Sequence, residues 1–374
     1  MIRYTLRIQA TAAAEERIVD ETLDIEQPDM LVAYLQRDGH IARDESIVSH
    51  TLTGGVSNKT VLVEREDSSW LLKQALPKLR VPVDWFSDPL RIHREADALR
   101  WLERNGPKGV VPRFVFEDRS QHVLCMEALP ASYENWKQKL LSGRVEQGDV
   151  ERFGRLLGFI HRRSSEQLDE LRPQFGDRTF FETLRLEPYY LYTAQQVPAA
   201  ADFLSPLVEA TRAVGAALVH GDFSPKNVLV RDEWLVLLDH EVAHVGEPAF
   251  DLGFSLAHLL SKAHHIPEAR EKLLSAAIVY WEVYRAEAGQ SAFVDALEEK
   301  AVRHTLACLL ARVRGRSQLE YLSDLEKERQ ASAVLELVPG PRTLQRLVDD
   351  FAAAIASNRL RRDAPSGPGR GPAG

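Results

Sequence analysis

The stretch from residue 217 to 241 restricts the possible folds of this chain more than any other. It reads ALVHGDFSPKNVLVRDEWLVLLDHE and is the one β-like segment in a C-terminal part that otherwise reads as mostly helical. Two apolar runs, at 228–230 and 234–239, flank the polar turn RDE, a pattern typical of a β-hairpin. Such a hairpin places Asn227 and Asp239 near one another at its open end.

The polar residues of this stretch are of the types that bind magnesium and act on phosphates. Asp222 precedes Asn227 by five positions, and Asp239 and Glu241 follow after the hairpin. Magnesium is held by hard oxygen ligands, one or two carboxylates together with substrate phosphates. A separate aspartate can orient an attacking hydroxyl and accept its proton. The pattern therefore indicates phosphoryl transfer.

The same residues resemble a known family. HGDFSPKN resembles the catalytic loop of the aminoglycoside phosphotransferase family, relatives of choline kinases and methylthioribose kinases with a protein-kinase-like fold. DHE at 239–241 resembles its metal-binding motif, and GEPAFDLGFSLAHLL is similar to its Gly-x-Pro and Asp-Leu-Gly stretch. The resemblance implies that Asp222 is the catalytic base and that Asp251 is structural. The implied magnesium ligands are Asn227, Asp239 and, directly or through water, Glu241.

The N-terminal part reads as a small antiparallel sheet. β-rich runs at 46–52, 58–66 and 68–75 are separated by Gly54-Gly55 and by a polar turn, and further strands are expected at 111–118 and 122–128. A helix is expected to begin near Pro89 and to end near Asn105. Upstream of the sheet, a short strand and a helix are expected, with Asp29 as the N-cap and Gly39 as the stop.

The resemblance also implies a nucleotide site in this part. Lys73 is expected to contact the α- and β-phosphates, and Glu95, on the following helix, to pair with Lys73. A complete Gly-x-Gly-x-x-Gly is absent, so phosphate contacts are also expected from polar side chains of the Gly-Gly loop. The adenine edge is expected to bond the backbone of Glu127 and Leu129. The residues expected over the phosphates are Gly54, Gly55, Ser57 and Asn58.

Together these features predict an α+β, bilobal, protein-kinase-like fold. A small β-rich lobe over 1–129 would bind the nucleotide, and a larger, mainly helical lobe over 130–360 would carry the catalytic and acceptor-binding residues. The tail, 361–374, combines Pro, Gly and charge with nothing to bury and is expected to be disordered.

Composition excludes several classes of partner. The chain has 47 Lys and Arg against 55 Asp and Glu, a formal charge of −8, which provides no general field for nucleic acid or acidic membranes. Its apolar stretches are shorter than the ~20 residues that a membrane helix needs. Cys125 and Cys308 are too few for a disulfide framework or a Cys-rich zinc site, so we expect a reducing, cytoplasmic setting. The oligomeric state is left open.

We therefore interpret the chain as an ATP- and Mg²⁺-dependent kinase that phosphorylates a hydroxyl of a small molecule. Methylthioribose kinases carry an Arg-rich, Gly-containing stretch where this chain has Arg312 and Arg314, so both are candidate acceptor-binding residues. A solvated helix end is the alternative for this stretch. Arginine suits a neutral or anionic acceptor better than a polycationic aminoglycoside.

The alternative function is a catalytically degraded kinase fold that serves as a nucleotide-binding or scaffold protein. Intact Lys73, Glu95, Asp222, Asn227 and Asp239 argue against it, because a binding module has no need of a catalytic base.

Overall fold

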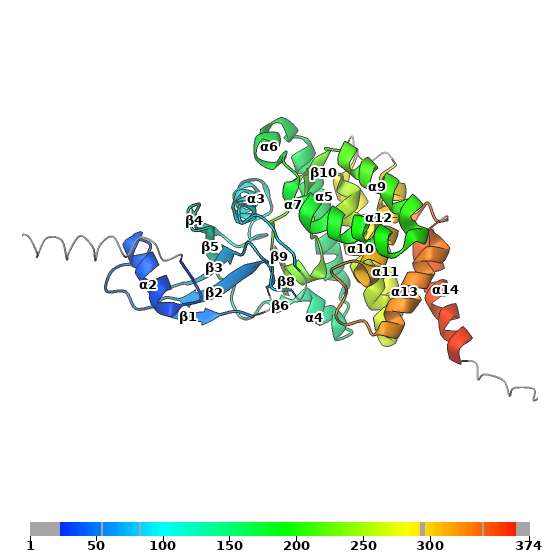
Figure 1. Ribbon diagram of the computed structural model, residues 1–374, viewed down its shortest axis with the longest axis horizontal. Coiled ribbons are helices and arrows are strands. Elements are labelled where there is room, and N and C mark those ends of the chain that lie inside the picture. The colour runs from blue at the N-terminus through cyan, green and yellow to red at the C-terminus, as the bar shows by residue number, and fades with distance from the viewer. Residues whose placement is uncertain (1–22, 54, 82–83, 292–295, 339, 364–374) are drawn as a thin grey trace, which may run out of the picture. The chain divides into compact units, whose positions relative to one another are not determined.

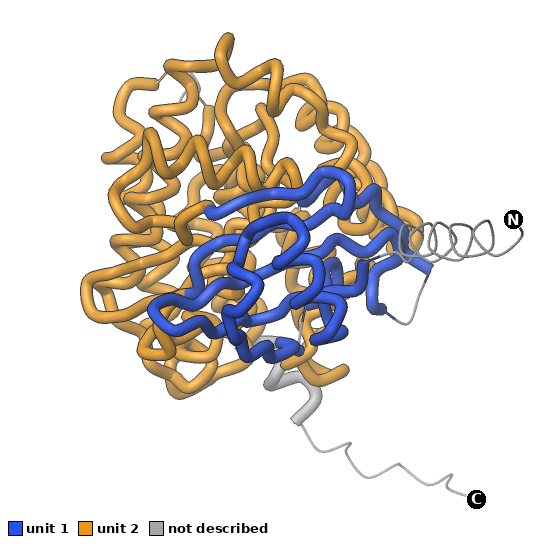
Figure 2. The backbone as a smooth tube through the Cα atoms, turned by 90° about the vertical axis from the view of Figure 1, so that its left-hand side faces the viewer, with its two compact units in different colours: residues 1–92, 115–128 blue, residues 93–114, 129–374 orange. Residues whose placement is uncertain are grey.

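The computed structural model describes residues 23–53, 55–81, 84–291, 296–338 and 340–363 (Figure 1). Gly54 and most of the predicted disordered tail, 364–374, lie outside the described residues. The chain forms two compact units, shown in different colours in Figure 2: residues 1–92 with 115–128, and residues 93–114 with 129–374. The first contains a five-stranded sheet and the second is mainly helical, which confirms the predicted α+β fold class.

The sheet of the first unit is built from the predicted strands. Its order is β1-β2-β3-β5-β4, and β2 pairs antiparallel with β1 and β3, as β3 does with β5. The strands and the preceding helix are α2 (Pro28–Arg37), β1 (Val48–Thr51), β2 (Asn58–Glu64), β3 (Ser69–Ala75), β4 (Phe114–Asp118) and β5 (Val123–Glu127).

Helix α2 covers one face of this sheet. Its buried Leu31 and Leu35 belong to the same core cluster as Val61, Leu72 and Val123, which lie on three adjacent strands. Because side chains alternate along a strand, these residues share one face. The helix thus completes the core of the sheet.

The start of α2 differs from the sequence prediction. Gln27, without a side-chain cap bond, occupies the N-cap position, and Asp29 lies in the first turn. The expected N-cap role of Asp29 is therefore wrong. Pro28 is preorganised for the first helical position, where an acidic residue next to it also interacts favourably with the helix dipole. Gly39 follows the end of the helix with φ of 74°, as expected of a stop residue.

The second unit contains most of the helices. Up to residue 213 its elements are α3 (Arg91–Asn105), whose first two residues belong to the first unit, β6 (Glu134–Asn135), α4 (Trp136–Leu141), α5 (Gln147–Ser165), α6 (Leu168–Phe175), α7 (Thr179–Phe181), the π-helix η2 (Glu182–Leu191), α8 (Tyr192–Gln196), the 3₁₀ turn η3 (Pro198–Ala200) and α9 (Ala201–Ala213). They continue with β7 (Ala217–Val219), η4 (Pro225–Asn227), β8 (Val228–Arg231), β9 (Trp234–Leu237), β10 (His244–Gly246), α10 (Pro248–His265), η5 (Pro267–Ala269), α11 (Arg270–Ala288), α12 (Leu297–Arg314), α13 (Asp324–Leu337) and α14 (Leu344–Asp363).

The predicted hairpin is present as β8 and β9. Val228 pairs with Leu237 and Arg231 pairs with Trp234, so the chain reverses at Asp232-Glu233. Strand β6 joins the outer side of β8, a pairing that its short sequence did not indicate. Pairing with β6 therefore anchors the β8 side of the hairpin, and pairing between β8 and β9 fixes their register.

Helix α10 forms the centre of the helical unit. It is buried along nearly its whole length and packs against α11 and α12. At Gly253 the backbones of α10 and α12 approach closely: a Cβ atom built there would lie 2.3 Å from the Cβ of His304 and 2.5 Å from its carbonyl carbon. Among the helices of the described ranges, none is long and apolar enough to cross a membrane.

We expect Gly253→Ala to lower the free energy of unfolding by about 1–3 kcal/mol, the usual cost of overpacking. The helix backbones must separate to admit the methyl group, and this outweighs the ~1 kcal/mol by which alanine favours a helix over glycine. Urea denaturation measures the change. Gly148→Ala in α5 is the matched control, because its Cβ would meet only the flexible end of Arg152, at 3.3 Å. A Gly253→Ala protein as stable as the parent would contradict the close helix approach.

Candidate active site

The loop that follows β7 is held by one buried carboxylate. Asp251, fully buried in the first turn of α10, accepts hydrogen bonds from the backbone N–H of His220 (2.7 Å) and of Gly221 (2.8 Å). Gly221 has φ of 77°, and a Cβ there would lie 2.7 Å from a methyl group of Val242. Glycine is therefore required where the chain turns into Asp222.

Asp251 is itself held by a histidine in the core. His161 of α5, fully buried, lies 3.3 Å from a carboxylate oxygen of Asp251 through Nε2 and 2.9 Å from the hydroxyl of Tyr284 through Nδ1. Burial alone would raise the pKa of Asp251, but the bond to His161, the electrostatic effect of the nearby histidines and the backbone N–H of His220 outweigh it and lower the pKa. His161 therefore has a partner at each ring nitrogen and supports the loop before Asp222 through Asp251.

His220 connects this loop to the end of the hairpin. Its Nδ1 accepts from the backbone N–H of Asp222 (3.1 Å), and its Nε2 donates to the carbonyl of Leu238 (3.1 Å), which corresponds to a neutral ring. Burial lowers the pKa of His220 and so favours this neutral form. The backbone before Asp239 is thereby tied to the backbone of Asp222.

Asn227 makes the second connection. Its side-chain N–H donates to the carbonyl of Asp222 (3.0 Å), and its own carbonyl accepts from the N–H of Leu238 (2.9 Å). The predicted proximity of Asn227 to Asp239 at the open end of the hairpin is therefore supported by the backbone. Asp239 adopts φ of 68°, a left-handed conformation that is uncommon for a residue other than glycine and that recurs at functional sites.

The donor atoms at this end fit magnesium. Because Asn227 donates a side-chain N–H to the carbonyl of Asp222, its side-chain oxygen is the atom available as a metal ligand. The carboxylates of Asp239 and Glu241 supply oxygen ligands of the same hard type. Within the described ranges no three His, Cys, Asp or Glu residues form a group that could hold a metal ion. One or two carboxylates plus substrate phosphates suffice for magnesium, so the set suits a metal that arrives with a nucleotide.

An arginine that the sequence did not single out lies against Asp222. Arg185, in η2, places a guanidinium nitrogen 3.0 Å from the carboxylate of Asp222. Its other nitrogens donate to the carbonyls of Gly221 (2.6 Å) and Leu184 (2.7 Å). Burial would lower the pKa of Arg185, but the nearby carboxylates, Asp222 first among them, outweigh it and raise the pKa. No local pattern around Arg185 could have indicated this pairing.

In the first unit, Ser57 and Asn58, two of the predicted phosphate-binding residues, are held by hydrogen bonds. Asn58 donates to the hydroxyl of Ser57 (3.1 Å), and both residues are buried. The fully buried Arg91, also missed from sequence, donates to the carbonyls of Ser57 and Leu76. A Cβ at Gly55 would meet nothing closer than 3.6 Å, so space does not require glycine there.

The remaining predicted nucleotide residues occupy regular elements. Lys73 lies in β3 between Thr60 of β2 and Leu124 of β5. Glu127 ends β5, and Leu129 is the first residue of the second unit after it. Glu95 is buried in α3 and belongs to the second unit. The roles of all these residues, and the pairing of Lys73 with Glu95, stay predictions.

The two candidate acceptor arginines differ in their surroundings. Arg312 is nearly buried at the end of α12 and donates to the hydroxyl of Tyr189 (3.0 Å) and to Ser317. Arg314 pairs with Glu328 at 2.5 Å. Their roles toward an acceptor also stay predictions.

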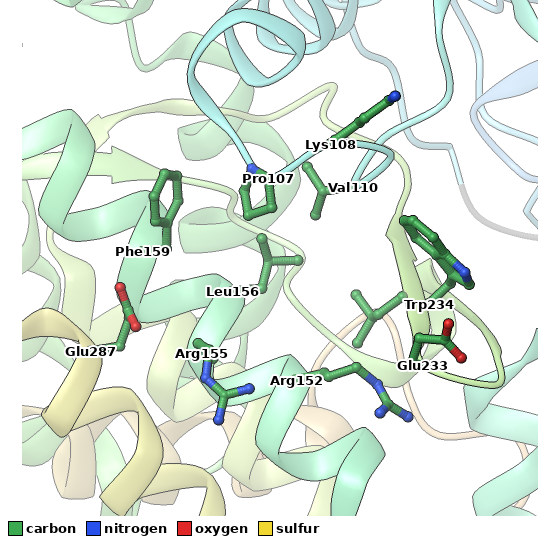
Figure 3. A pocket seen from close by; sticks show the side chains of 11 residues that line it. Pro107, Lys108, Val110, Arg152, Arg155, Leu156, Phe159, Glu233, Trp234 and Glu287 are labelled. Carbon is green, nitrogen blue, oxygen red and sulfur yellow. The ribbon is translucent and has the colours of Figure 1, made fainter.

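A cavity of about 290 Å³ lies elsewhere in the helical unit (Figure 3). Arg152 and Arg155 of α5 and Trp234 at the turn of the hairpin are among its lining residues, and none of the predicted site residues is. Asn227 and Asp239 lie at the opposite, open end of that hairpin. The cavity is therefore not the predicted phosphoryl-transfer site.

Comparison with known proteins decides the family. Residues 50–289 match the family model described as the phosphotransferase enzyme family, APH. The chain belongs to this family. The predicted family and enzyme class, a phosphotransferase, are therefore confirmed.

Individual relatives of this phosphotransferase are distant. A methylthioribose kinase from Enterobacter sp. (strain 638) is 24% identical over 257 residues, which cover 55% of the chain and 62% of the relative. The chain thus spans less than two thirds of that curated relative.

Two solved structures share the kinase-like fold. An ethanolamine kinase from Plasmodium vivax matches with a TM-score of 0.52 at 11% identity, over 93% of this chain and 94% of that one. Amicoumacin kinase hAmiN, solved with AMP-PNP, Ca²⁺ and amicoumacin, matches with a TM-score of 0.50 at 15% identity, over 80% and 91%. The bilobal kinase-like fold class predicted from sequence is confirmed by these neighbours.

Proposed function

We propose that this phosphotransferase transfers the γ-phosphoryl group of ATP, with Mg²⁺, to a hydroxyl group of a small molecule. The observation that carries the proposal is the hydrogen-bonded junction of the loop and the hairpin, in which Asn227 bonds both the carbonyl of Asp222 and the residue before Asp239. The junction ties the backbone of Asp222, the proposed base, to Asn227 and to the residue before Asp239, the proposed metal ligands. Phosphoryl transfer requires a base and a metal site close together.

Each predicted residue has a role in this proposal. Asp222 orients the acceptor hydroxyl and takes its proton. Bound magnesium would neutralise charge on the transferred phosphates, and Asn227, Asp239 and Glu241 would hold it. The β-rich lobe over 1–129 binds the nucleotide and the helical lobe over 130–360 the acceptor. The residues proposed to hold the nucleotide are Lys73, Glu95, Gly54, Gly55, Ser57, Asn58, Glu127 and Leu129.

The surroundings of the site support this proposal. Arg185 contacts the carboxylate of Asp222 and the carbonyl of Gly221 through two of its nitrogens, and its third nitrogen bonds the carbonyl of Leu184 in η2. These contacts orient the carboxylate of Asp222 for contact with a reacting group. The relative solved with AMP-PNP and Ca²⁺ supports a nucleotide and a divalent cation as cofactors. Both cysteines are buried free thiols, which fits the reducing cytoplasm that we propose as its compartment.

The test is ADP release measured with Mg-ATP and a panel of hydroxylated metabolites and antibiotics. We expect at least one acceptor to raise ADP release well above the rate with water alone, and removal of Mg²⁺ to abolish it. Tight Mg-ATP binding without phosphorylation of any acceptor would favour the scaffold alternative.

We expect Asp239→Ala to weaken magnesium-dependent ATP binding by at least ~10-fold, because the variant lacks a carboxylate ligand. Calorimetry with and without Mg²⁺ measures the effect, which should vanish when the metal is omitted. Asp232→Asn is the matched control, since this carboxylate is exposed at the turn of the same hairpin. Unchanged affinity for Mg-ATP in Asp239→Ala would show that the metal assignment is wrong.

A further inference from the structure

Cationic side chains gather beside Asp222 in the helical unit. The guanidinium groups of Arg185 and Arg312 both lie over the ring of Tyr189, 5.8 and 5.7 Å from its centre. Arg185 also lies 6.0 Å from the ring of Phe254 in α10. Tyr189 therefore contacts both Arg185, which pairs with the proposed catalytic base, and Arg312 of α12.

The cluster continues along α10. The ring of Phe254 lies 5.1 Å from that of His258, whose carbonyl accepts from the ammonium group of Lys262 (3.3 Å). Lys262 and Lys137 both lie over the ring of Tyr321, at 5.3 and 6.0 Å. We call Lys137, Arg185, Lys262 and Arg312 the cationic cluster.

The charge of this cluster is not fully compensated. Arg185 pairs with Asp222, and Lys137 pairs with Glu320. Among the described residues, no carboxylate lies within 4.0 Å of the ammonium group of Lys262, which is fully buried, or of the guanidinium group of Arg312. Buried charges are normally paired or bind a ligand, so two such cations together form an incomplete ionic site.

Two buried polar groups at the cationic cluster also lack a hydrogen-bond partner. The Nε atom of Arg312 and the hydroxyl of Tyr321 are buried without a hydrogen-bond partner. Burial, together with the charges of Lys137 and Arg312, lowers the pKa of Lys262 to about 7. His258 is kept neutral because burial and the surrounding cations lower its pKa. A bound anion would supply the missing acceptor and offset the excess positive charge.

We propose that the cationic cluster binds an anionic group of the acceptor, a carboxylate or a phosphate ester, while the acceptor hydroxyl faces Asp222. This inference rests on the proposed kinase function and adds the chemical class of its substrate. Arg312 provides the planar donor fork for the anion, and Lys262 adds positive charge to the cluster. All three donor groups of Arg185 already bond protein atoms, so Arg185 positions Asp222. The positive charge of the cationic cluster disfavours polycationic acceptors.

The first test compares matched acceptors. The kcat/KM is measured for glycerol, glycerate and glycerol 3-phosphate, for ribitol, ribonate and ribose 5-phosphate, and for choline and ethanolamine. We expect an anionic member to exceed its neutral counterpart by at least ~10-fold, the effect of one charge-assisted hydrogen bond. The carboxylate and phosphate members tell the two anion sources apart. Efficient use of neutral or cationic acceptors in preference to every anion would overturn the inference and leave the kinase function intact.

The second test removes the donor fork. Arg312→Gln should lower kcat/KM for the preferred anion by ~10-fold or more and change the neutral counterpart by less than ~3-fold. Arg212→Gln, a surface arginine of α9 paired with Glu182, is the control and should change neither. Calorimetric binding of the same anions keeps the test independent of turnover. If no acceptor is phosphorylated, the kinase proposal fails; if no anion binds, or if Arg312→Gln binds them unchanged, this inference fails.

A third measurement needs no ligand. Lys262→Met should raise the Tm of the free protein by at least ~2 °C, because it replaces an uncompensated buried charge by an apolar side chain of similar size. The same variant should lose the preference for anionic acceptors. Lys139→Met is the matched control and should lower the Tm, since Lys139 lies 2.9 Å from the buried carboxylate of Asp149. A lower Tm for Lys262→Met would show that Lys262 is a structural cation and would overturn its role.

Discussion

Asp222→Asn lowers the turnover of phosphoryl transfer by at least ~100-fold and leaves nucleotide binding nearly intact. Asparagine keeps the size of the side chain but cannot accept a proton, and loss of a general base costs about 10²–10⁴ in rate. The nucleotide contacts proposed for Lys73, Asp239 and Asn227 are untouched by the change. Steady-state ADP release and calorimetric binding of Mg-ATP measure the two quantities separately.

A control variant and the choice of temperature make this result specific. Asp232→Asn changes an exposed carboxylate in the hairpin and should leave turnover unaltered. The Tm of Asp222→Asn should fall somewhat, because Arg185 loses its charged partner at 3.0 Å, so turnover is compared at a temperature where both proteins are folded. Near-normal turnover in Asp222→Asn would remove Asp222 from the role of base.

The second large effect is expected at Asp251, whose replacement by asparagine should cost about 3–5 kcal/mol of unfolding free energy, as for a broken buried ion pair. The carboxylate accepts from two backbone N–H groups and lies beside His161, whereas an amide would turn an N–H group toward one of these partners. Catalysis should be lost as well, because the same bonds hold the loop before Asp222. Urea denaturation gives the stability change, with the exposed Asp324→Asn as control.

The pH dependence of this stability follows from the direction of the pKa shift. The pKa of Asp251 in the folded protein is lowered from its ordinary value of 3.8, so the folded state binds the proton less tightly than the unfolded state. The stabilisation that ionised Asp251 gives the folded protein is therefore complete above the pKa of the unfolded state. It is lost as the pH falls below about 3.8 toward the pKa of the folded state. The stability gap between the parent and Asp251→Asn should be constant near neutral pH and shrink in acid. A gap that widens in acid would contradict this account.

Much of the site was predictable because its order is local. The turn is set by the two apolar runs at 228–230 and 234–239 around the polar turn RDE, and this places Asn227 near Asp239 without any information from the rest of the chain. Likewise, the apolar residues of α5 recur at helical spacing, and this spacing places His161 on the buried face of the helix. Such local patterns predict both the type of secondary-structure element and the face on which its side chains lie.

The sequence by itself therefore determined the strands of the N-terminal sheet, the hairpin and the Asp222–Asn227–Asp239 constellation, and through them the family and the enzyme class. Only the tertiary structure decided which distant charges meet: Arg185 on Asp222, Asp251 under the loop, and Lys262 near Arg312, where no described carboxylate lies within 4.0 Å of either cation. The physical reason is that hydrophobic periodicity states which face of a helix is buried but not which helix covers it. Ion pairs and uncompensated charges arise only when those faces pack.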